Sequence, residues 1–456
     1  MLRRQRGWAC GMLMVYAQAI SAGEATSARG QFVPPEPGAV QSSFNQALLG
    51  QLTLRQAEQL FASGNRELLA AKRAVEGAEA NTLIAGQRPN PVLSLGLSSV
   101  NVNRGQGNMN QNGANGVWDK TYNSALQVSQ LYERGNKREL RTSVAESAVK
   151  AYGFDLKETY RQQALAMAMA YYDLKLAQET LLIQQANVAS YDNTLQAAQL
   201  RLKAGDVASA DVARIRVDAL RASNDLRQAE ATLQKTQATL AYLLGKDQDA
   251  SKLYASDPWP GLTSDQLTGA ESAWLPQRSD VQAAEARMEQ AQQARKLAES
   301  LKTRDVTWSL AYQHFPGQEP GSAPDTVGAS VSIPLFTNYQ YEGEAARAEV
   351  DYTSAMEAKE QVKAAAVAEM RRAKADLQAA VDKNRRFDQS ILSEAQKAAE
   401  AAEFAYQHGA MSVMDLLDAR RILRALQLES ASVKADYAKS LSAWLAATRQ
   451  AFTNQD

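Results

Sequence analysis

Residues 160–205 read YRQQALAMAMAYYDLKLAQETLLIQQANVASYDNTLQAAQLRLKAG, and apolar side chains recur in this stretch at every seventh position. The repeat comprises Tyr160, Met167, Leu174, Leu181, Val188, Leu195 and Leu202. An uninterrupted apolar heptad is typical of helices that pack along a coiled-coil seam. No proline lies between Pro91 and Pro258, and proline inside a helix costs about 3 kcal/mol. We therefore expect one helix over 137–204, roughly 100 Å long.

A glycine turn is expected to reverse this helix. Gly205 suits the left-handed conformation that ends helices, and Asp206 or Ser209 is placed to cap the next helix, over 208–245. The apolar seam resumes in that helix at Val212 and continues to Leu240. The two helices should therefore pack antiparallel as a long hairpin.

The same plan occurs twice along the chain. Three pairs of residues each lie 204 positions apart: Leu131 and Leu335, Gly205 and Gly409, and Asp211 and Asp415. A constant offset indicates an internal duplication, with repeats over 53–257 and 258–456. In the first repeat we expect a helix over 53–87 and strands over about 92–103 and 121–132, followed by the hairpin. In the second we expect a helix over 280–302, strands over about 305–315 and 326–336, and helices over 344–408 and 412–451.

The four strand segments alternate apolar residues with polar or small ones. Each is about ten residues long, the length of a tilted strand that crosses an outer membrane. A soluble hairpin with one buried face is the alternative, but the long polar connector 103–113 is of extracellular type. Four strands cannot close a barrel, and an open edge in lipid leaves backbone groups unpaired at several kcal/mol each. Several chains are therefore expected to share one barrel.

The first 19 residues have the parts of a secretory signal peptide. Arg3, Arg4 and Arg6 precede an apolar core, and Ala17-Gln18-Ala19 offers a cleavage site. A transmembrane anchor is the alternative, but a run of about ten apolar residues is too short to span a bilayer. Residues 20–52 would then form an N-terminal periplasmic segment. Cys10, the single cysteine, lies inside the signal, before most of the apolar core, and is not expected to be acylated.

Composition and motifs argue against several classes of function. The 50 basic and 50 acidic residues cancel and form no basic stripe, so nucleic acid is not an expected partner. No nucleophile elbow, metalloprotease helix or phosphate-binding loop occurs, so we expect neither an enzyme nor a cofactor. His314 and His408 are the only histidines and, with no cysteine in the mature chain, they cannot make a dedicated metal site.

The duplicated plan and its junction motifs resemble the TolC-type outer-membrane efflux factors over essentially the whole mature chain. The resemblance is carried by Arg88-Pro89-Asn90-Pro91, by Lys203-Ala204-Gly205 with Asp211-Val212, and by Tyr406-Gln407-His408-Gly409 with Ser412 and Asp415-Leu416-Leu417-Asp418. Ser129-Gln130-Leu131-Tyr132 with Gly135-Asn136-Lys137-Arg138 is most similar to the CzcC-like members, which serve heavy-metal cation pumps.

This resemblance implies a mainly α mixed α+β membrane protein in the outer membrane, extending into the periplasm. Three identical chains would form a twelve-stranded β-barrel in outer-membrane lipid, continued by a periplasmic α-barrel of long antiparallel helices. Such a channel is a passive duct for heavy-metal cations delivered by an inner-membrane pump and a periplasmic adaptor. A duct for organic toxic compounds, or an elongated periplasmic scaffold or adaptor, are the alternatives.

The resemblance also assigns roles to residues at the helical turns. Gly205, Gly409 and Ser412 would lie at the periplasmic tip where the adaptor docks. Asp415 and Asp418 match acidic rings that narrow the entrance, while Asp211 and Tyr406 match polar contacts that hold the helix pairs shut. Met411 stands where an arginine often joins those contacts, so the closed state is expected to be held differently. For Asp415, a simple role in capping the returning helix remains the alternative.

Overall fold

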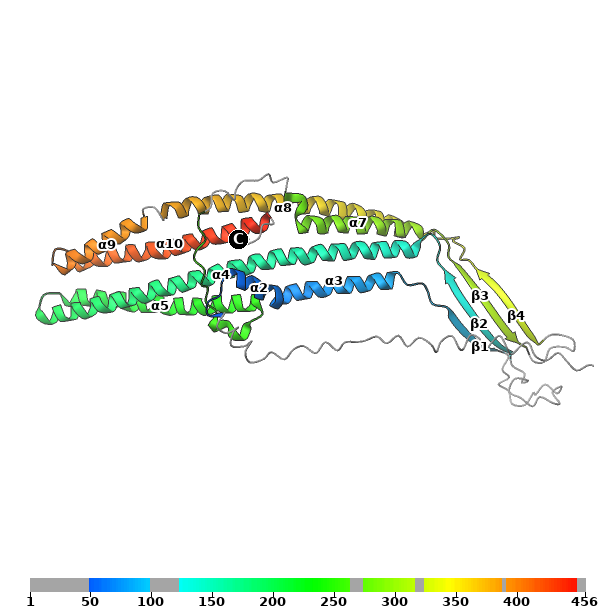
Figure 1. Cartoon of the computed structure of the whole chain (residues 1–456), viewed down its shortest axis with the longest axis horizontal. Helices are drawn as coiled ribbons and strands as arrows, with labels where there is room; N and C mark the ends of the chain where they lie inside the picture. The colour runs from blue at the N-terminus through cyan, green and yellow to red at the C-terminus, as the bar shows by residue number, and fades with distance from the viewer. Residues whose placement is uncertain (1–48, 99–122, 263–273, 316–323, 388–390, 449–456) are drawn as a thin grey trace, which may run out of the picture. The chain divides into compact units, whose positions relative to one another are not determined.

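The computed structural model describes residues 49–98, 123–262, 274–315, 324–387 and 391–448, all within one unit, Leu48–Asp456 (Figure 1). The expected signal peptide and almost all of the segment 20–52 lie outside the described residues. The first repeat contains α2 (Leu54–Gly64), α3 (Arg66–Ala85), β1 (Val92–Ser98), β2 (Asn123–Tyr132), α4 (Lys137–Ala204) and α5 (Ser209–Leu244). The second contains α7 (Ser279–Ser300), β3 (Val306–His314), β4 (Asp325–Ser332), α8 (Glu342–Arg386), α9 (Leu392–Gln407) and α10 (Val413–Ala447). Short 3-10 turns, η2 (Asp247–Lys252) and η4 (Leu275–Gln277), lie between α5 and α7.

The four strands form one antiparallel sheet in the order β1-β2-β3-β4. The register aligns the apolar residues in rows across the sheet, such as Leu95, Leu126, Tyr312 and Val327. The next row, on the opposite face, holds Gly96, Ala125, Gln313 and Thr326. The apolar face is exposed, with Leu95 at 78% and Val327 at 73%. One face is therefore suited to lipid and the other to water.

Strand β4 is shorter than the expected 326–336, because it ends at Ser332. Pro334 has no backbone N–H to donate to a neighbouring strand, which accounts for the early end. The expected strand residues 99–103 and 121–122 lie outside the described residues.

The expectation of one helix over 53–87 is wrong, because the chain breaks between α2 and α3 at Asn65. Asn65 has an extended backbone (φ −68°, ψ 123°), and its side-chain oxygen accepts a hydrogen bond from the Leu68 N–H at 2.9 Å. Its amide nitrogen donates to the Leu243 carbonyl at 3.0 Å. The hydrogen bonds of the Asn65 side chain to the start of α3 and to the end of α5 favour a break here over one continuous helix.

The expected helix over 344–408 is described in two parts, α8 and α9. Residues 388–390 between them lie outside the described residues, so a continuous helix there stays a prediction. Phe387 and Ile391, which flank this interval, are π-helical.

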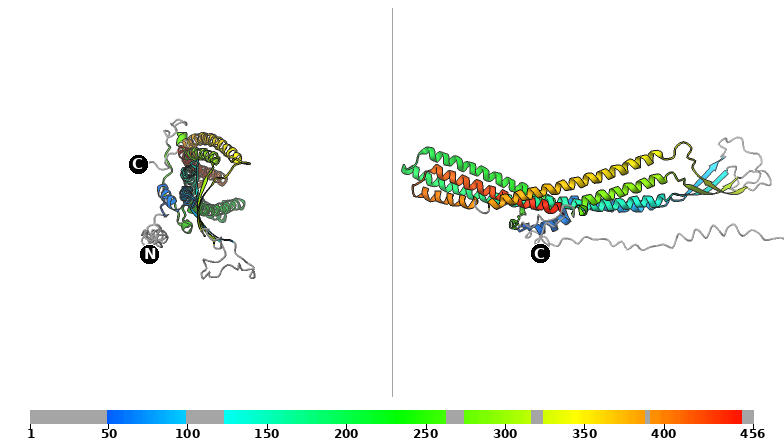
Figure 2. Two further views of the ribbon diagram at one scale, coloured as in Figure 1. Left: turned by 90° about the vertical axis from the view of Figure 1, so that its right-hand side faces the viewer. Right: turned by 90° about the horizontal axis from the view of Figure 1, so that it is seen from above.

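The long helices pack as neighbouring hairpins (Figures 1 and 2). Helix α4 packs against α3, α5, α7 and α10, while α8 packs against α7 and α10. Met167 and Leu174 are fully buried on the α4 seam, whereas Tyr160 and Leu202 remain 40% and 37% exposed. No helix within the described ranges has enough consecutive apolar residues to traverse a bilayer.

A buried ionic network joins the two repeats. The Arg278 side chain is 1% exposed and donates hydrogen bonds to Asp280 at 3.0 and 2.8 Å, to Glu369 at 2.6 Å and to the Ala447 carbonyl at 3.1 Å. Glu369 also accepts from Arg161 of α4 at 2.8 Å. Burial raises the pKa of Glu369, but the Arg278 hydrogen bond and the Arg161 charge outweigh it, so this pKa lies below 4.5.

Gly245 ends α5 with a positive φ of 67°, and its backbone touches Gly64 at the end of α2. A Cβ at Gly245 would lie 2.3 Å from the Gly64 carbonyl oxygen, whereas a Cβ at Gly205 (φ 87°) would meet no atom within 4 Å. Gly205→Ala should therefore cost only left-handed strain, about 1 kcal/mol. Gly245→Ala should cost about 2–3 kcal/mol, since the α2–α5 contact must also open.

Thermal unfolding of the two glycine variants, followed by circular dichroism, checks this difference. Gly205→Ala is the matched control, because it has the same backbone strain without the close approach. Equal losses of stability would show that the contact between Gly64 and Gly245 contributes nothing.

Candidate functional site

The candidate site lies at the end of the long helices opposite the strands, where two turns join α4 to α5 and α9 to α10 (Figure 1). In the first turn, Gly205 ends α4, and the Asp206 N–H donates to the Arg201 carbonyl at 2.9 Å. Neither Asp206 nor Ser209 caps α5, because the N-cap is Ala208 and no side chain bonds the helix start. Asp211 lies in the first turn of α5, 3.8 Å from Arg214 of the same helix.

The second turn is built around Gly409, which has φ 74°. Ser412 is the N-cap of α10: its hydroxyl accepts from the Asp415 N–H at 3.2 Å and donates to the Asp415 carboxylate at 2.7 Å. Asp415 thus takes part in the capping contact at the start of α10. Its side chain is also exposed, so its charge faces solvent. Asp418, one turn further, is also exposed and lies 3.0 Å from Arg421.

Tyr406 links the two hairpins through its ring rather than its hydroxyl. The Arg201 guanidinium of α4 lies 4.8 Å from the ring centroid, a cation–π distance. Among the described residues the buried Tyr406 hydroxyl has no hydrogen-bond partner, and no bond joins it to Asp211. Met411 packs against the small apolar cluster that contains Tyr406 and Leu416. Met411 thus makes an apolar contact at the position where the resemblance implies that an arginine is common.

Three arginines of α10 reach across to the other hairpin. Arg421 donates to Asp218 of α5 at 2.6 Å, and Arg424 pairs with Asp225 of the same helix. Arg420 donates to the Thr194 hydroxyl of α4 at 2.5 Å. Its other nitrogen donates to Glu403 of α9 at 2.9 Å. We call Arg420, Arg421 and Arg424 the arginine ladder.

The ladder connects the two hairpins through charged side chains. The side chain of Asp218 is 10% exposed, so its carboxylate depends on Arg421 for compensation. The hydrogen bond to Asp218, which outweighs the opposing effect of burial, raises the pKa of Arg421. Breaking these pairs would leave acidic groups on α5 facing α10 without their cations.

The sequence reasoning did not identify the arginine ladder, although a signal was present. Positions 420, 421 and 424 lie within one helical turn, and Asp218 and Asp225 are one heptad apart on the facing helix. Opposite charges on two neighbouring helices favour ion pairs between them, although Arg421 and Arg424 are three residues apart and Asp218 and Asp225 are seven apart. The resemblance points instead to Asp211 and Tyr406, which no hydrogen bond joins among the described residues.

The two histidines make local contacts. His314 Nδ1 lies 2.7 Å from Asp325 within the sheet, and His408 Nδ1 lies 2.8 Å from the Phe404 carbonyl. Across the described ranges there is no group of three or more histidine, cysteine or acidic side chains that could hold a metal ion.

Known proteins are similar to this chain along most of its length. The model of the family of outer membrane efflux proteins matches residues 57–246 and 272–448. The pyoverdine export outer membrane protein OpmQ of Pseudomonas putida is 25% identical over 393 residues, covering 84% of this chain and 82% of OpmQ. The cobalt-zinc-cadmium resistance protein CzcC of Cupriavidus metallidurans is 24% identical over 388 residues, covering 83% of this chain and 86% of CzcC.

A solved structure shares the fold. The outer membrane protein VceC of Vibrio cholerae has a TM-score of 0.69 at 21% identity, covering 88% of this chain and 97% of VceC. The two matched family segments coincide with the two repeats of helix, strand pair and helical hairpin.

Proposed function

The chain belongs to the outer membrane efflux protein family, and on that premise we propose that three copies form one exit duct for heavy-metal cations, supplied by a periplasmic adaptor and an inner-membrane pump. The family identified from the sequence is confirmed. The protein is an outer-membrane efflux channel that extends into the periplasm, not an enzyme, and the scaffold alternative falls with that membership.

The open sheet is the observation that supports a shared duct. Strands β1 and β4 are its two edges and pair with no further strand within the described residues. The same sheet exposes an apolar face, so it is suited to lipid, where each unpaired backbone group costs several kcal/mol. Pairing β1 of one copy with β4 of the next removes every edge when the ring closes. Three copies supply the twelve strands of the proposed barrel.

The proposed cargo is supported by the likeness to CzcC and by the strand–helix motif Ser129-Gln130-Leu131-Tyr132. Organic compounds are the second candidate, because OpmQ, a pyoverdine exporter, is equally similar. Deleting the gene and scoring sensitivity to zinc, cobalt, cadmium, copper and a panel of organic toxins separates the two. Sensitivity to the metals alone supports our assignment, whereas sensitivity to organic toxins alone would contradict it.

We place the adaptor contact at the two turns, with Gly205, Gly409 and Ser412 setting their shape. Apolar side chains stand exposed nearby, including Leu200 at 67% and Phe404 at 65%. Exposed apolar residues beside a helical turn suit docking of another helical hairpin.

We propose that Asp415 and Asp418 form the acidic entrance of the duct. In a trimer, carboxylates assumed to lie about 6 Å apart repel by roughly 3 kcal/mol per pair at an effective dielectric near 20. Bound cations relieve that repulsion and so block the entrance. Both side chains are exposed, and a cation that binds Asp418 would compete with Arg421, which lies 3.0 Å away.

Asp415→Asn with Asp418→Asn should weaken block by divalent cations about tenfold in planar bilayers, because the charge is lost while the Ser412 cap keeps an acceptor. Asp351→Asn, an equally exposed change on α8, is the control and should leave block unchanged. Unaltered block in the double variant would remove both residues from the gate.

A further inference from the structure

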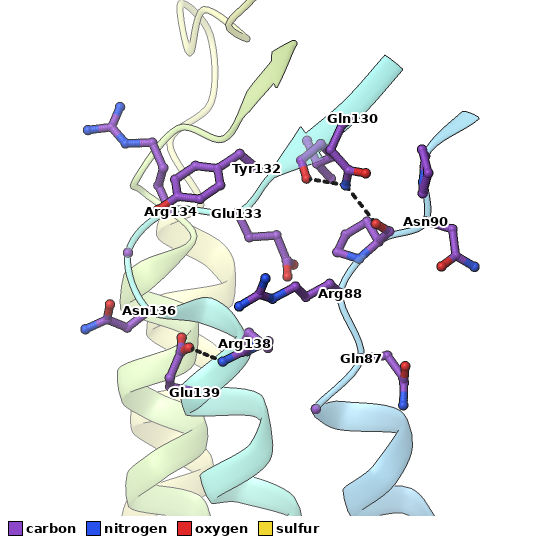
Figure 3. A pocket seen from close by; sticks show the side chains of 15 residues that line it. Gln87, Arg88, Asn90, Gln130, Tyr132, Glu133, Arg134, Asn136, Arg138 and Glu139 are labelled. Carbon is purple, nitrogen blue, oxygen red and sulfur yellow. Dashed lines mark hydrogen bonds and ion pairs between the residues drawn. The ribbon is translucent and has the colours of Figure 1, made fainter. Parts of the chain in front are cut away.

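A hollow of about 960 Å³ lies where the first strand pair joins its helices (Figure 3). Its walls are the linker from α3 to β1 (86–91), the linker from β2 to α4 (130–136) and the first turn of α4. The Gln130 amide donates to the Pro89 carbonyl at 2.8 Å and ties the two linkers together on the strand side.

The hollow carries arginines in excess of its acids. Glu133 is bound by Arg141 at 2.5 and 2.9 Å, and Glu139 is bound by Arg138 at 2.8 Å. Arg88 extends toward the first turn of α4, and Arg134 stands at the rim beside Tyr132 (Figure 3).

The two remaining guanidinium groups are unpaired. The side chains of Arg88 and Arg134 make no ion pair or hydrogen bond with any residue in the described ranges, and both are exposed. The charge of Arg88 acts on Glu139 through space, but Glu139 is already bound by Arg138, so the hollow keeps an excess of positive charge.

The neighbouring junctions of the same sheet are filled. Between β2 and β3, Lys137 donates to Asp305 at 2.8 Å. Between β3 and β4, the guanidinium of Arg304 lies 5.5 Å from the centre of the Phe336 ring. The linker arginine of the second repeat thus has an aromatic partner, whereas the Arg88 side chain makes no hydrogen bond, ion pair or ring contact among the described residues. This difference between the repeats suits the first junction to an external ligand.

The hollow directly follows the apolar face of the sheet. That face ends in two exposed aromatic residues, Trp308 at 58% and Tyr132 at 63%. Aromatic side chains mark the boundary between hydrocarbon and headgroups in outer-membrane sheets. Arg134 follows Tyr132 by two residues, and Arg88 precedes β1 by four. Both guanidinium groups therefore stand just beyond the hydrocarbon, on the side of the helices.

From this geometry we infer that the hollow binds the phosphate group of an anionic phospholipid in the periplasmic leaflet, held by Arg88 and Arg134. The inference rests on the proposed function, since the sheet must lie in the outer membrane with its helices in the periplasm. Guanidinium groups bind phosphate oxygens through charge-assisted, often bidentate hydrogen bonds. An anionic phospholipid would supply the negative charge that Arg88 and Arg134 can bind. Its headgroup would also lie at the depth that the aromatic residues of the sheet mark.

Native mass spectrometry of the full channel in detergent, mixed with equal amounts of phosphatidylglycerol and phosphatidylcholine, tests the inference. The wild type should retain about tenfold more phosphatidylglycerol, and Arg88→Gln with Arg134→Gln should abolish this preference. The matched control is Arg73→Gln with Arg227→Gln, which also removes two exposed arginines but lies outside the hollow. This control should keep the preference.

Two results would overturn the inference. One is a wild type that conducts in planar bilayers but shows no preference for phosphatidylglycerol, because conduction reports the duct independently of the lipid site. The other is a double variant that loses its assembly in lipid-free detergent yet keeps the lipid preference. That outcome would assign both arginines to a contact with a neighbouring copy.

Discussion

Arg278→Ala is expected to lower the stability of the helical region by about 3–5 kcal/mol, because it removes one partner of a buried ionic network. The wild-type guanidinium compensates Asp280 and Glu369 and also satisfies the Ala447 carbonyl. Without it, Arg161 is left to compensate these carboxylates, and it is shared with Glu158. The network would then hold more negative than positive charge in a place that water reaches poorly.

Denaturant unfolding of the detergent-solubilised channel measures this loss. Arg347→Ala is the control: Arg347 also pairs with an acid at 2.8 Å, but its side chain is 77% exposed, so the change should cost at most about 0.5 kcal/mol. Arg278→Met separates charge from volume, because it refills the space and leaves the acids uncompensated. Equal losses for the variants at 278 and 347 would show that the buried network contributes no more stability than an exposed ion pair.

The same network predicts a dependence on pH. Burial raises the pKa of Asp280 and of Glu369, but hydrogen bonds and charge from Arg278 and Arg161 outweigh it and bring both below the ordinary 3.8 and 4.5. The unfolded chain therefore takes up these protons first, so their contribution is complete above pH 4.5 and is lost as the pH falls through the lowered values. The difference between wild type and Arg278→Met should accordingly shrink in acid.

Replacing Arg421 and Arg424 by alanine should open the helical end of the channel. Each arginine joins α10 to an acid of α5, and removing it leaves Asp218 or Asp225 without its cation. Loss of a partly buried pair costs about 1–3 kcal/mol after allowance for exposure, since the side chain of Arg421 is 45% exposed. The ratio of open to closed states should therefore rise by about tenfold or more.

Single-channel conductance in planar bilayers reports this change. Arg227→Ala on α5 is the control, because its partner Glu230 lies on the same helix and holds no second hairpin. Exchanging the charges, with Asp218→Arg and Arg421→Asp, should restore the conductance of the closed state if the ion pair between these positions holds the hairpins together. Conductance unchanged in the double alanine variant would show that the ladder does not hold the hairpins.

Much of the helical fold follows from local sequence signals. Heptad spacing and the absence of proline describe α4, because helix formation over many turns depends on residues a few positions apart. The break at Asn65 had a signal that was not used: glycine followed by asparagine is a typical helix end and new N-cap. The π-type residues Phe387 and Ile391 have no comparable sequence signature.

The site depends on contacts that local spacing does not specify. Gly205 and Gly409 mark the turns, because positive φ strongly favours glycine. The partner of Arg421, in contrast, lies 203 residues away on another helix. Which faces of two helices meet is decided by the packing of the whole bundle, and the approach of Gly64 to Gly245 depends on it in the same way.

The number of chains that enclose one pore tests the account most directly. Native mass spectrometry of the channel extracted from the outer membrane, combined with conductance of the same preparation, gives both quantities. Our account predicts three copies per complex and a water-filled conducting pore, because one four-stranded sheet leaves two edges unpaired. A single chain that remains stable without detergent and does not conduct would contradict it.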